Sequence, residues 1–445
     1  MRKSYGMERL AAFVSEHIND DTTRLIMNRA KWPEIDMDLA VNCIESRRKL
    51  KGKVQEWCDD PRLVFPRKLS AEQCSSSATG TYKAELAERI HLTMTDVTPK
   101  SEIQNNESPK DWIIEDSIVG FRLADLTGGL GVDSWFFSQK ASQVLYNEMQ
   151  TPLCDAARHN FRALGVENIL ISNRAVGTVK ESGLVSPEEL LGEFQPDIIY
   201  MDPARRGEGG RKVFLIEDCT PDVLTLKDEL FAQCSNFLIK LSPMADITMV
   251  CDRLGICCRE VHIVSSDGEC KELLLWLDKD WSEGYSITAV ELPSGYPERS
   301  AAILTFNPAD EKSRLTSLCS EIGEFLFEPG KSLTKAGAFN TTGTHFGIGK
   351  LGRSTHHYVT SDMEKAELLK DYGKIFKVIS WQPLDKRSIK EIGKTYPRAE
   401  VTARNIPLTS EALRKKLGCA SGGDVHIFGL KSDVQGNLLL VCQRT

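Results

Sequence analysis

Asp125-Leu-Thr-Gly-Gly-Leu-Gly-Val-Asp133 is the stretch that decides the fold of this 445-residue chain. An apolar run, residues 118–124, precedes it, and residues 134–140 after it read as a helix. A strand, a glycine turn and a helix in this order bring the backbone close to a nucleotide-like ligand, because Gly129 and Gly131 carry no Cβ atom. The stretch therefore predicts the first strand–turn–helix unit of a doubly wound α/β fold.

The residue that opens this turn, Asp125, indicates a ligand with a positive charge. The N-terminus of a helix favours anions, and a carboxylate at this point would repel a pyrophosphate. S-adenosylmethionine presents a cationic amino group and no phosphate, so it is the cofactor that we expect. Glu148 ends the next predicted strand about 20 residues after the glycine turn, where doubly wound folds place a carboxylate that accepts hydrogen bonds from both ribose hydroxyls.

A third acidic residue, Asp202, follows the apolar run 196–201. Pro203 ends this strand and fixes the turn, so that Asp202 points to the carboxyl edge of the sheet, where open α/β folds bind their ligands. Each of these features on its own has an ordinary interpretation: the glycine turn as a common loop, Glu148 as a surface carboxylate and Asp-Pro as a simple turn. Their order at the ends of successive predicted strands predicts a nucleotide-type site.

The glycine loop resembles the Asp-x-Gly-x-Gly-x-Gly loop of class I S-adenosylmethionine-dependent methyltransferases, with Thr127 at the position of the first glycine. Four further segments resemble the bacterial group of these proteins that carries a THUMP-like C-terminal domain: residues 69–76, 202–206, 237–243 and 265–276. The resemblance covers most of the chain. It implies an RNA methyltransferase of a group whose target is poorly defined.

The resemblance also implies roles for cofactor-binding residues. Asp125 would face the methionine end of the cofactor and Glu148 the ribose. Asn173, after the third strand, is as well suited to a turn as to a contact with the adenine. The remaining residues that we expect around the cofactor are Thr127, Gly128, Gly129, Gly131 and Asp133.

The predicted catalytic residues are Asp202, Pro203 and Arg205. The Asp202 carboxylate and the Pro203 carbonyl would accept hydrogen bonds from an exocyclic amine of a base and later accommodate its proton. Amino-methylating enzymes commonly place Tyr or Phe in this motif, whereas this chain has Ala204 and Arg205, so the guanidinium would stack on the base or clamp a phosphate. The predicted substrate-binding residues are Arg206, Arg211, Lys240 and Glu269, the last two on the resemblance alone.

The pattern along the chain predicts four domains, of which the methyltransferase and THUMP-like identities are what the resemblance implies. They are a helical domain over 1–100, a Rossmann-like methyltransferase domain over 101–283, a small ferredoxin-like α+β segment over 284–332 and a basic THUMP-like domain over 333–445. Five strands of the second domain, followed by a hairpin through Asp267-Gly268, predict a parallel sheet with a closing antiparallel pair, hence the fold class α/β. The expected strands lie near 121–126, 143–148, 168–172, 197–202, 236–241, 258–265 and 270–277. In the third segment we expect strands at 286–292 and 301–306, then a helix to Phe325.

Charge is distributed unevenly along the chain. The whole protein has a net charge of −7, whereas residues 335–445 contain 18 Lys and Arg against 10 Asp and Glu, a net of +8. A basic domain attached to an acidic body is typical of a module that captures RNA, so we expect RNA as the partner. The contacts would go mainly to phosphates or RNA shape. A predicted helix over 38–57 has a second basic face, with Arg47, Arg48, Lys49, Lys51 and Lys53, which we expect to be solvated, with a second RNA contact as the alternative.

The composition indicates an ordinary globular protein of the cytoplasm. No apolar run reaches the ~18 residues of a membrane helix, and the first residues lack the apolar core of a secretory signal, so we expect no membrane partner. The 13 cysteines include no Cys-x-x-Cys pair. Neither a disulfide framework nor a metal site is therefore expected.

Two other functions fit part of the sequence. An NAD-dependent oxidoreductase would use the same turn and ribose carboxylate, but Ser134 stands where that fingerprint has Gly or Ala, and Asp125 suits a pyrophosphate badly. A non-catalytic RNA-binding protein that retains a methyltransferase fold also fits, although the intact Asp125, Glu148 and Asp202 argue against it. An ATPase is excluded, since Pro329-Gly-Lys-Ser332 imitates the end of a P-loop but Phe325 stands where its first glycine must be.

Overall fold

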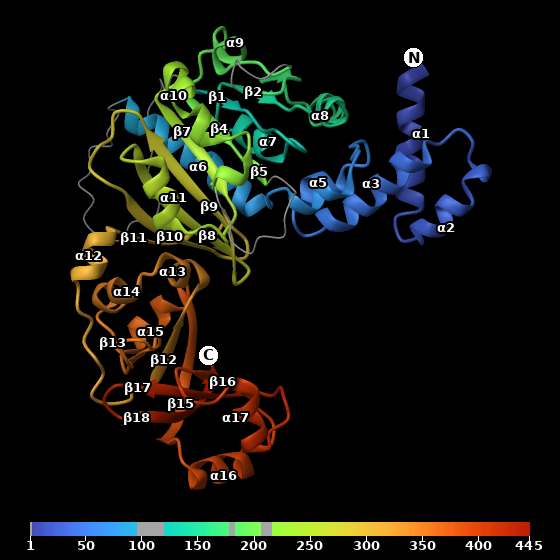
Figure 1. Cartoon of the computed structure of the whole chain (residues 1–445). Coiled ribbons are helices and arrows are strands. Elements are labelled where there is room, and N and C mark those ends of the chain that lie inside the picture. The colour runs from blue at the N-terminus through green and yellow to red at the C-terminus, as the bar shows by residue number, and fades with distance from the viewer. Residues whose placement is uncertain (1, 96–119, 178–182, 206–215) are drawn as a thin grey trace. The chain divides into compact units, whose positions relative to one another are not determined.

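The computed structural model of the chain describes residues 2–95, 120–177, 183–205 and 216–445 (Figure 1). The chain divides into two compact units. The first comprises Met1–Glu260 and Leu273–Gly284, and the second comprises Val261–Glu272 and Tyr285–Thr445. The finer division into four domains stays a prediction.

The first unit begins with a run of helices. They are α1 (Arg2–Glu16), α2 (Thr22–Met27), the 3-10 helix η1 (Arg29–Lys31), α3 (Met37–Leu50), α4 (Gln55–Asp59), α5 (Lys68–Gln73) and α6 (Ser77–Met94). The side chains of Asp21, Asp36 and Ser76 accept hydrogen bonds from first-turn amides of α2, α3 and α6. These caps satisfy amides that have no partner inside the helix, and so they define where each helix begins.

One basic residue of α3 is not on a solvated face, contrary to the expectation from helical spacing. Arg47 is buried, and its guanidinium donates hydrogen bonds to the carbonyls of Cys58, Asp60 and Leu63 at 2.7, 2.8 and 3.0 Å. A buried cation is costly unless hydrogen bonds compensate it, and here three carbonyl groups accept from the two terminal nitrogens, while Nε has no partner among the described residues. Arg47 therefore stabilises the turn after α4 and is not available to RNA.

A mostly parallel sheet follows. Six of its strands are β1 (Arg122–Asp125), β2 (Gln143–Asn147), β3 (Ile169–Ser172), β4 (Ile198–Met201), β7 (Asn236–Leu241) and β9 (Glu269–Asp278), in the order β3-β2-β1-β4-β7-β9. The first four residues of β9 belong to the second unit, and the other strand residues belong to the first. The pairs between β3 and β7 are parallel, and β9 runs antiparallel to β7. β9 pairs with β8 (Cys258–Ser266) across the Asp267-Gly268 turn, and this hairpin is divided between the two units. The predicted parallel sheet with a closing antiparallel hairpin is thus confirmed.

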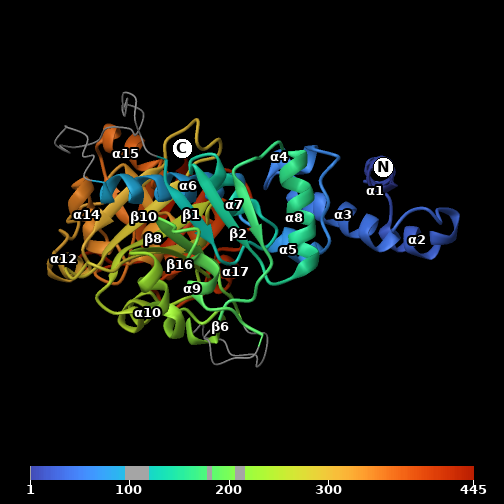
Figure 2. The same ribbon diagram turned by 90° about the horizontal axis from the view of Figure 1, so that it is seen from above.

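Helices cover both faces of this sheet. They include α7 (Val132–Ser138), α8 (Thr151–Ala163), α9 (Pro187–Leu191), α10 (Val223–Gln233) and α11 (Ile247–Leu254). α6 and α10 lie on opposite faces, and α8 lies beside the helical region at α3–α5 (Figure 2). The side-chain amide of Asn160 in α8 joins the two regions, because it bonds both the N–H and the carbonyl of Val64 at 2.8 and 2.9 Å. A short ribbon of β5 (Ala204–Arg205) and β6 (Cys219–Thr220), with the 3-10 helix η3 (Ile216–Asp218), follows β4.

The second unit contains the antiparallel pair β10 (Ser286–Leu292) and β11 (Ala302–Phe306), followed by a seven-stranded sheet. The order of that sheet is β13-β14-β12-β15-β18-β17-β16. Its strands are β12 (Phe325–Pro329), β13 (Gly349–Lys350), β14 (Tyr358–Thr360), β15 (Gly373–Pro383), β16 (Glu400–Arg404), β17 (Val425–Ser432) and β18 (Gly436–Arg444). The helices of this unit are α12 (Pro308–Ser313), α13 (Lys331–Ala336), α14 (Phe339–Phe346), α15 (Met363–Leu369), α16 (Lys386–Thr395) and α17 (Ser410–Leu417).

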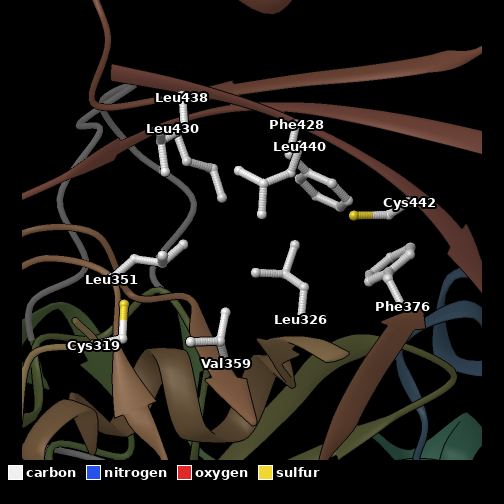
Figure 3. Packing of buried hydrophobic residues seen from close by; sticks show 10 residues of the cluster. All are labelled: Cys319, Leu326, Leu351, Val359, Phe376, Phe428, Leu430, Leu438, Leu440 and Cys442. Carbon is white, nitrogen blue, oxygen red and sulfur yellow. The ribbon is translucent and has the colours of Figure 1, made fainter. Parts of the chain in front are cut away.

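Two apolar clusters hold this second sheet. In the first, Leu326 and Val359 point toward Leu438 and Leu440 of β18, which shows that the sheet curls over its own core (Figure 3). The second cluster packs α16 and α17 against the other face of β18 through Leu439 and Val441. The basic residues of both helices are thereby directed away from the core.

The region before β12 differs from the expected helix to Phe325. The helix α12 ends at Ser313, and the backbone of Ser317 and Cys319 instead pairs with Lys350.

The segment that imitates the end of a P-loop lies at the start of α13. The Glu291 carboxylate accepts hydrogen bonds from the N–H and hydroxyl of Ser332, both at 2.7 Å, and so occupies the start of α13. This contact agrees with the exclusion of a phosphate site.

Candidate active site

The glycine loop lies between β1 and α7 at the carboxyl edge of the sheet. Gly129 and Gly131 adopt φ values of +54° and +92°, a region that side chains disfavour. A Cβ atom on Gly128 would lie 2.2 Å from the ring of Tyr146, whose hydroxyl donates a hydrogen bond to the Gly129 carbonyl at 2.7 Å. The loop therefore packs tightly against β2 at Gly128, and the close approach of Gly129 and Gly131 to a ligand stays a prediction.

Asp125, the last residue of β1, is 1% exposed. One carboxylate oxygen accepts a hydrogen bond from the Thr127 amide at 3.0 Å, and the other accepts one from the Ser134 hydroxyl at 2.5 Å. Burial raises the pKa of Asp125 to about 7, although both hydrogen bonds oppose that shift. Such a carboxyl group is only partly ionised at neutral pH, and a nearby cation would favour its charged form.

Glu148 directly follows β2, and it is buried. Its two carboxylate oxygens accept hydrogen bonds from the amides of Gly129 and Gln150 at 3.0 and 2.8 Å. Asn173 lies at the same turn, where its side chain donates to the Glu148 carbonyl at 2.7 Å and accepts from the Thr151 hydroxyl at 2.8 Å. Both polar atoms of Asn173 are thus engaged in the turn, which is the alternative role considered for this residue.

Asp202 follows β4, the neighbour of β1 on its other side. Its amide donates a hydrogen bond to the Thr127 hydroxyl at 2.6 Å, so the threonine in place of the first glycine joins the loop to this strand end. The Asp202 side chain is 41% exposed, and its carboxylate accepts a hydrogen bond from the Lys240 ammonium at 2.6 Å. Pro203 is buried, and Arg205 pairs through its backbone with Cys219 in the ribbon β5–β6.

A buried chain of charges extends from this point. Lys240 of β7 lies between Asp202 and Asp133, with its ammonium 3.9 Å from an Asp133 carboxylate oxygen. That oxygen also accepts a hydrogen bond from the Tyr200 hydroxyl at 2.7 Å, and the other lies 3.3 Å from the ammonium of Lys83. Burial opposes ionisation of Asp133, yet the ammonium groups of Lys83 and Lys240 hold the pKa of this carboxyl below its ordinary value.

Lys83 and Tyr200 are the site residues that sequence reasoning missed. Lys83 lies on α6 in one stripe with the buried residues Leu86 and Ala87, one helical turn later, and Ile90, two turns later. A lysine at a core-facing position of an apolar helix stripe is the signal that could have marked it.

The structure brings together Asp125, Thr127, Glu148, Asp202 and Lys240 around the glycine loop. Arg206 and Arg211 lie outside the described residues. Glu269 belongs to the second unit, where its exposed side chain pairs with Lys271 at 2.8 Å. Within the described ranges, no three His, Cys, Asp or Glu side chains are arranged to hold a metal ion, and no helix is long and apolar enough to cross a membrane.

Comparison with known proteins finds matches to two domain families and to solved structures. Residues 373–444 match a THUMP domain-like family, and residues 325–366 match a ferredoxin-like domain, which the sequence had placed at 284–332. The crystal structure of a candidate methyltransferase from Porphyromonas gingivalis W83 aligns with a TM-score of 0.78 and 27% identity, over 99% of this chain and 98% of that chain. No curated protein matches.

Two shorter matches cover 36% of this chain. They are an rRNA methylase from Streptococcus thermophilus (TM-score 0.26, 12% identity, 88% of that chain) and M. capricolum TrmK in complex with S-adenosylhomocysteine (TM-score 0.25, 13% identity, 63% of that chain). The full-length match and the THUMP-like match confirm the resemblance to the bacterial class I methyltransferases with a THUMP-like C-terminal domain.

Proposed function

We propose that this chain, which has the class I methyltransferase fold and a THUMP-like domain, is an S-adenosylmethionine-dependent methyltransferase that modifies a base in RNA. One observation carries the proposal: Asp125, Glu148 and Asp202 lie at the carboxyl ends of three adjacent parallel strands, β1, β2 and β4. The strand order reverses at β1, and open α/β sheets bind ligands at such a point. The description of the Porphyromonas gingivalis protein as a candidate methyltransferase supports the same activity.

The residues around the glycine loop fit S-adenosylmethionine. The buried Asp125 carboxyl, with its raised pKa, would gain from a cationic amino group beside it. Each oxygen of Glu148 accepts one hydrogen bond from a backbone amide, which leaves further lone pairs for ribose hydroxyls. When bound, the cofactor supplies an activated methyl group. Asp133 has its carboxylate engaged by Lys83, Lys240 and Tyr200, so we assign it to holding the site and not to the cofactor.

Asp202 is the residue that we propose acts on the base. Its carboxylate, with the Pro203 carbonyl, would accept hydrogen bonds from an exocyclic amine, align the lone pair and accommodate the proton. A base within a duplex would have to be flipped to reach it. Arg205, Arg206 and Arg211 follow Asp202 in the sequence and would hold the base or its phosphates.

The THUMP-like domain would capture the RNA. α16 buries Ile392 in the apolar cluster with α17 and exposes Lys386, Arg387, Lys390 and Lys394. Such a face binds phosphates without reading sequence. Trp381 on β15 is 44% exposed, and an exposed indole can stack on an unpaired base.

Calorimetric titration with S-adenosylmethionine, S-adenosylhomocysteine and NAD tests the cofactor. We expect binding of the first two, with losses in Asp125→Ala and Glu148→Ala. NAD binding alone would favour the oxidoreductase, and binding of none of the three would favour a non-catalytic RNA-binding protein.

A second experiment tests the substrate. Labelled methyl transfer to total RNA should be abolished in Asp202→Ala while cofactor affinity is retained. Lys386→Glu/Lys390→Glu should weaken RNA binding and lower its salt dependence by about one unit of slope per lost phosphate contact. Lys365→Glu on α15 combined with Lys370→Glu at its C-cap changes the net charge equally and serves as the control.

A further inference from the structure

The helix α6 carries a lysine side chain that is fully buried. The exposed fraction of Lys83 is 0%, and its ammonium donates a hydrogen bond to the Ser75 hydroxyl at 3.0 Å. Removing an ammonium group from water is costly unless an opposite charge compensates it. Here the compensating group is Asp133, 3.3 Å away on α7. A buried ion pair thus joins the helical region to the catalytic sheet.

This pair is one end of a chain of four alternating charges: Lys83, Asp133, Lys240 and Asp202. The ammonium of Lys240 lies 2.6 Å from Asp202 and 3.9 Å from Asp133. The side chains of Lys240 and Asp133 are 12% and 11% exposed, whereas Asp202 is 41% exposed. Only the Asp202 end of the chain therefore opens substantially to solvent, where a substrate base could meet it.

The position of Lys240 depends on how Asp133 is compensated. The Lys83 ammonium lies 3.3 Å from one oxygen of Asp133, and the Tyr200 hydroxyl donates a hydrogen bond to the other. Lys240 lies 3.9 Å from that second oxygen and forms its short contact with Asp202 instead. Without the charge of Lys83, Asp133 would remain buried with Lys240 as its nearest cation. Coulomb attraction in a poorly solvated site is strong, and it would draw the Lys240 ammonium toward Asp133 and away from Asp202.

We propose that Lys83 is a positioning residue, which acts through Asp133 and Lys240 to hold the carboxylate of Asp202 in place. The helical region before the sheet is then part of the active site. This inference rests on the proposed methyl transfer and names the residues that orient its catalytic carboxylate. Lys83 lies on α6, far in sequence from the glycine loop, so the motif of that loop does not contain it.

The test compares Lys83→Met with a matched control. Lys83→Met keeps the length of the side chain and removes its charge. Lys140→Met removes the 2.9 Å ion pair with Glu88, which also joins α6 to the α7 region but does not belong to the charge chain. We expect Lys83→Met to lower kcat by roughly 10- to 100-fold, the cost of a small misplacement of a reacting group, with KM for RNA and affinity for S-adenosylhomocysteine nearly unchanged. Lys140→Met should retain the wild-type kcat.

A second variant keeps the test informative if Lys83→Met folds poorly. Lys83→Met/Asp133→Asn removes both buried charges and leaves Lys240 with Asp202 as its partner, so kcat should recover above that of the single variant. A kcat in Lys83→Met equal to that in Lys140→Met would overturn the positioning role alone. A folded double variant with no recovery would overturn it as well. Absence of methyl transfer by the wild-type protein would overturn both the proposed function and this inference.

Discussion

Raising the pH from 6 to 7 should tighten the binding of S-adenosylmethionine about fivefold. Burial raises the pKa of Asp125 to about 7. Only the ionised carboxylate attracts a cationic amino group, and for a pKa near 7 the ionised fraction is roughly one tenth at pH 6 and one half at pH 7. Affinity that follows this fraction rises about fivefold, or ~1 kcal/mol. The upper limit of pH 7 is chosen because an α-amino group, whose pKa is ~7.7–8.0, is still mostly protonated there.

The direction follows from linkage. The pKa of Asp125 is raised in the free protein, and a bound cation lowers it, so binding below pH 7 releases a proton. Calorimetry in two buffers of different ionisation enthalpy measures both the affinity and the protons released. Asp125→Asn can still accept from the Thr127 amide but does not titrate, so its weaker affinity should not change between pH 6 and 7. Adenosine, which has no amino acid group, should likewise bind equally at both values. Equal pH dependence in wild type and Asp125→Asn would refute the reasoning.

Three further outcomes are expected. Thr127→Val removes the hydroxyl that accepts the hydrogen bond from the Asp202 amide at 2.6 Å, a loss of about 1–3 kcal/mol that should slow methyl transfer roughly tenfold or more. Thr127→Ser keeps a hydroxyl and should retain the rate. Equal rates in the two variants would contradict the role of the hydroxyl. Gly128→Ala places a methyl group 2.2 Å from the Tyr146 ring, and overpacking of about 1–3 kcal/mol should weaken S-adenosylhomocysteine binding by roughly tenfold in calorimetry; unchanged affinity would show that the loop can shift. Burial lowers the pKa of His357 to about 3. As pH drops from 7 to 5, this imidazole therefore takes up a proton in the unfolded chain but not in the folded one, so the unfolding free energy of the second unit should fall. In urea unfolding, His357→Leu should reduce the fall in unfolding free energy between pH 7 and 5 by about 2 kcal/mol. An equal fall in the variant and the wild type would show that His357 is not its source.

The sheet of the first unit could be predicted because its signals are local. A strand and its end are indicated within a few residues by an apolar run that stops at a glycine turn, at Asp-Pro 202–203 or at the turn Asp267-Gly268. All seven predicted strands are present. The helix expected to reach Phe325 was wrong for the opposite reason. Its second half pairs with Lys350, and no feature within residues 314–325 indicates that distant partner.

What the sequence by itself determined is the α/β fold, the order of its elements and the three carboxylates at adjacent strand ends. Only the tertiary structure decided what those side chains contact. Arg47 has the spacing of a solvated residue, yet the carbonyls that surround it come from residues 58–63. Lys83, Asp133 and Lys240 are far apart in the chain, and they form one ion-pair network because α6 packs on α7 beside β7. Periodicity reports which way a side chain faces relative to its own element, whereas charge compensation depends on which elements meet, and that is a property of the packed molecule alone.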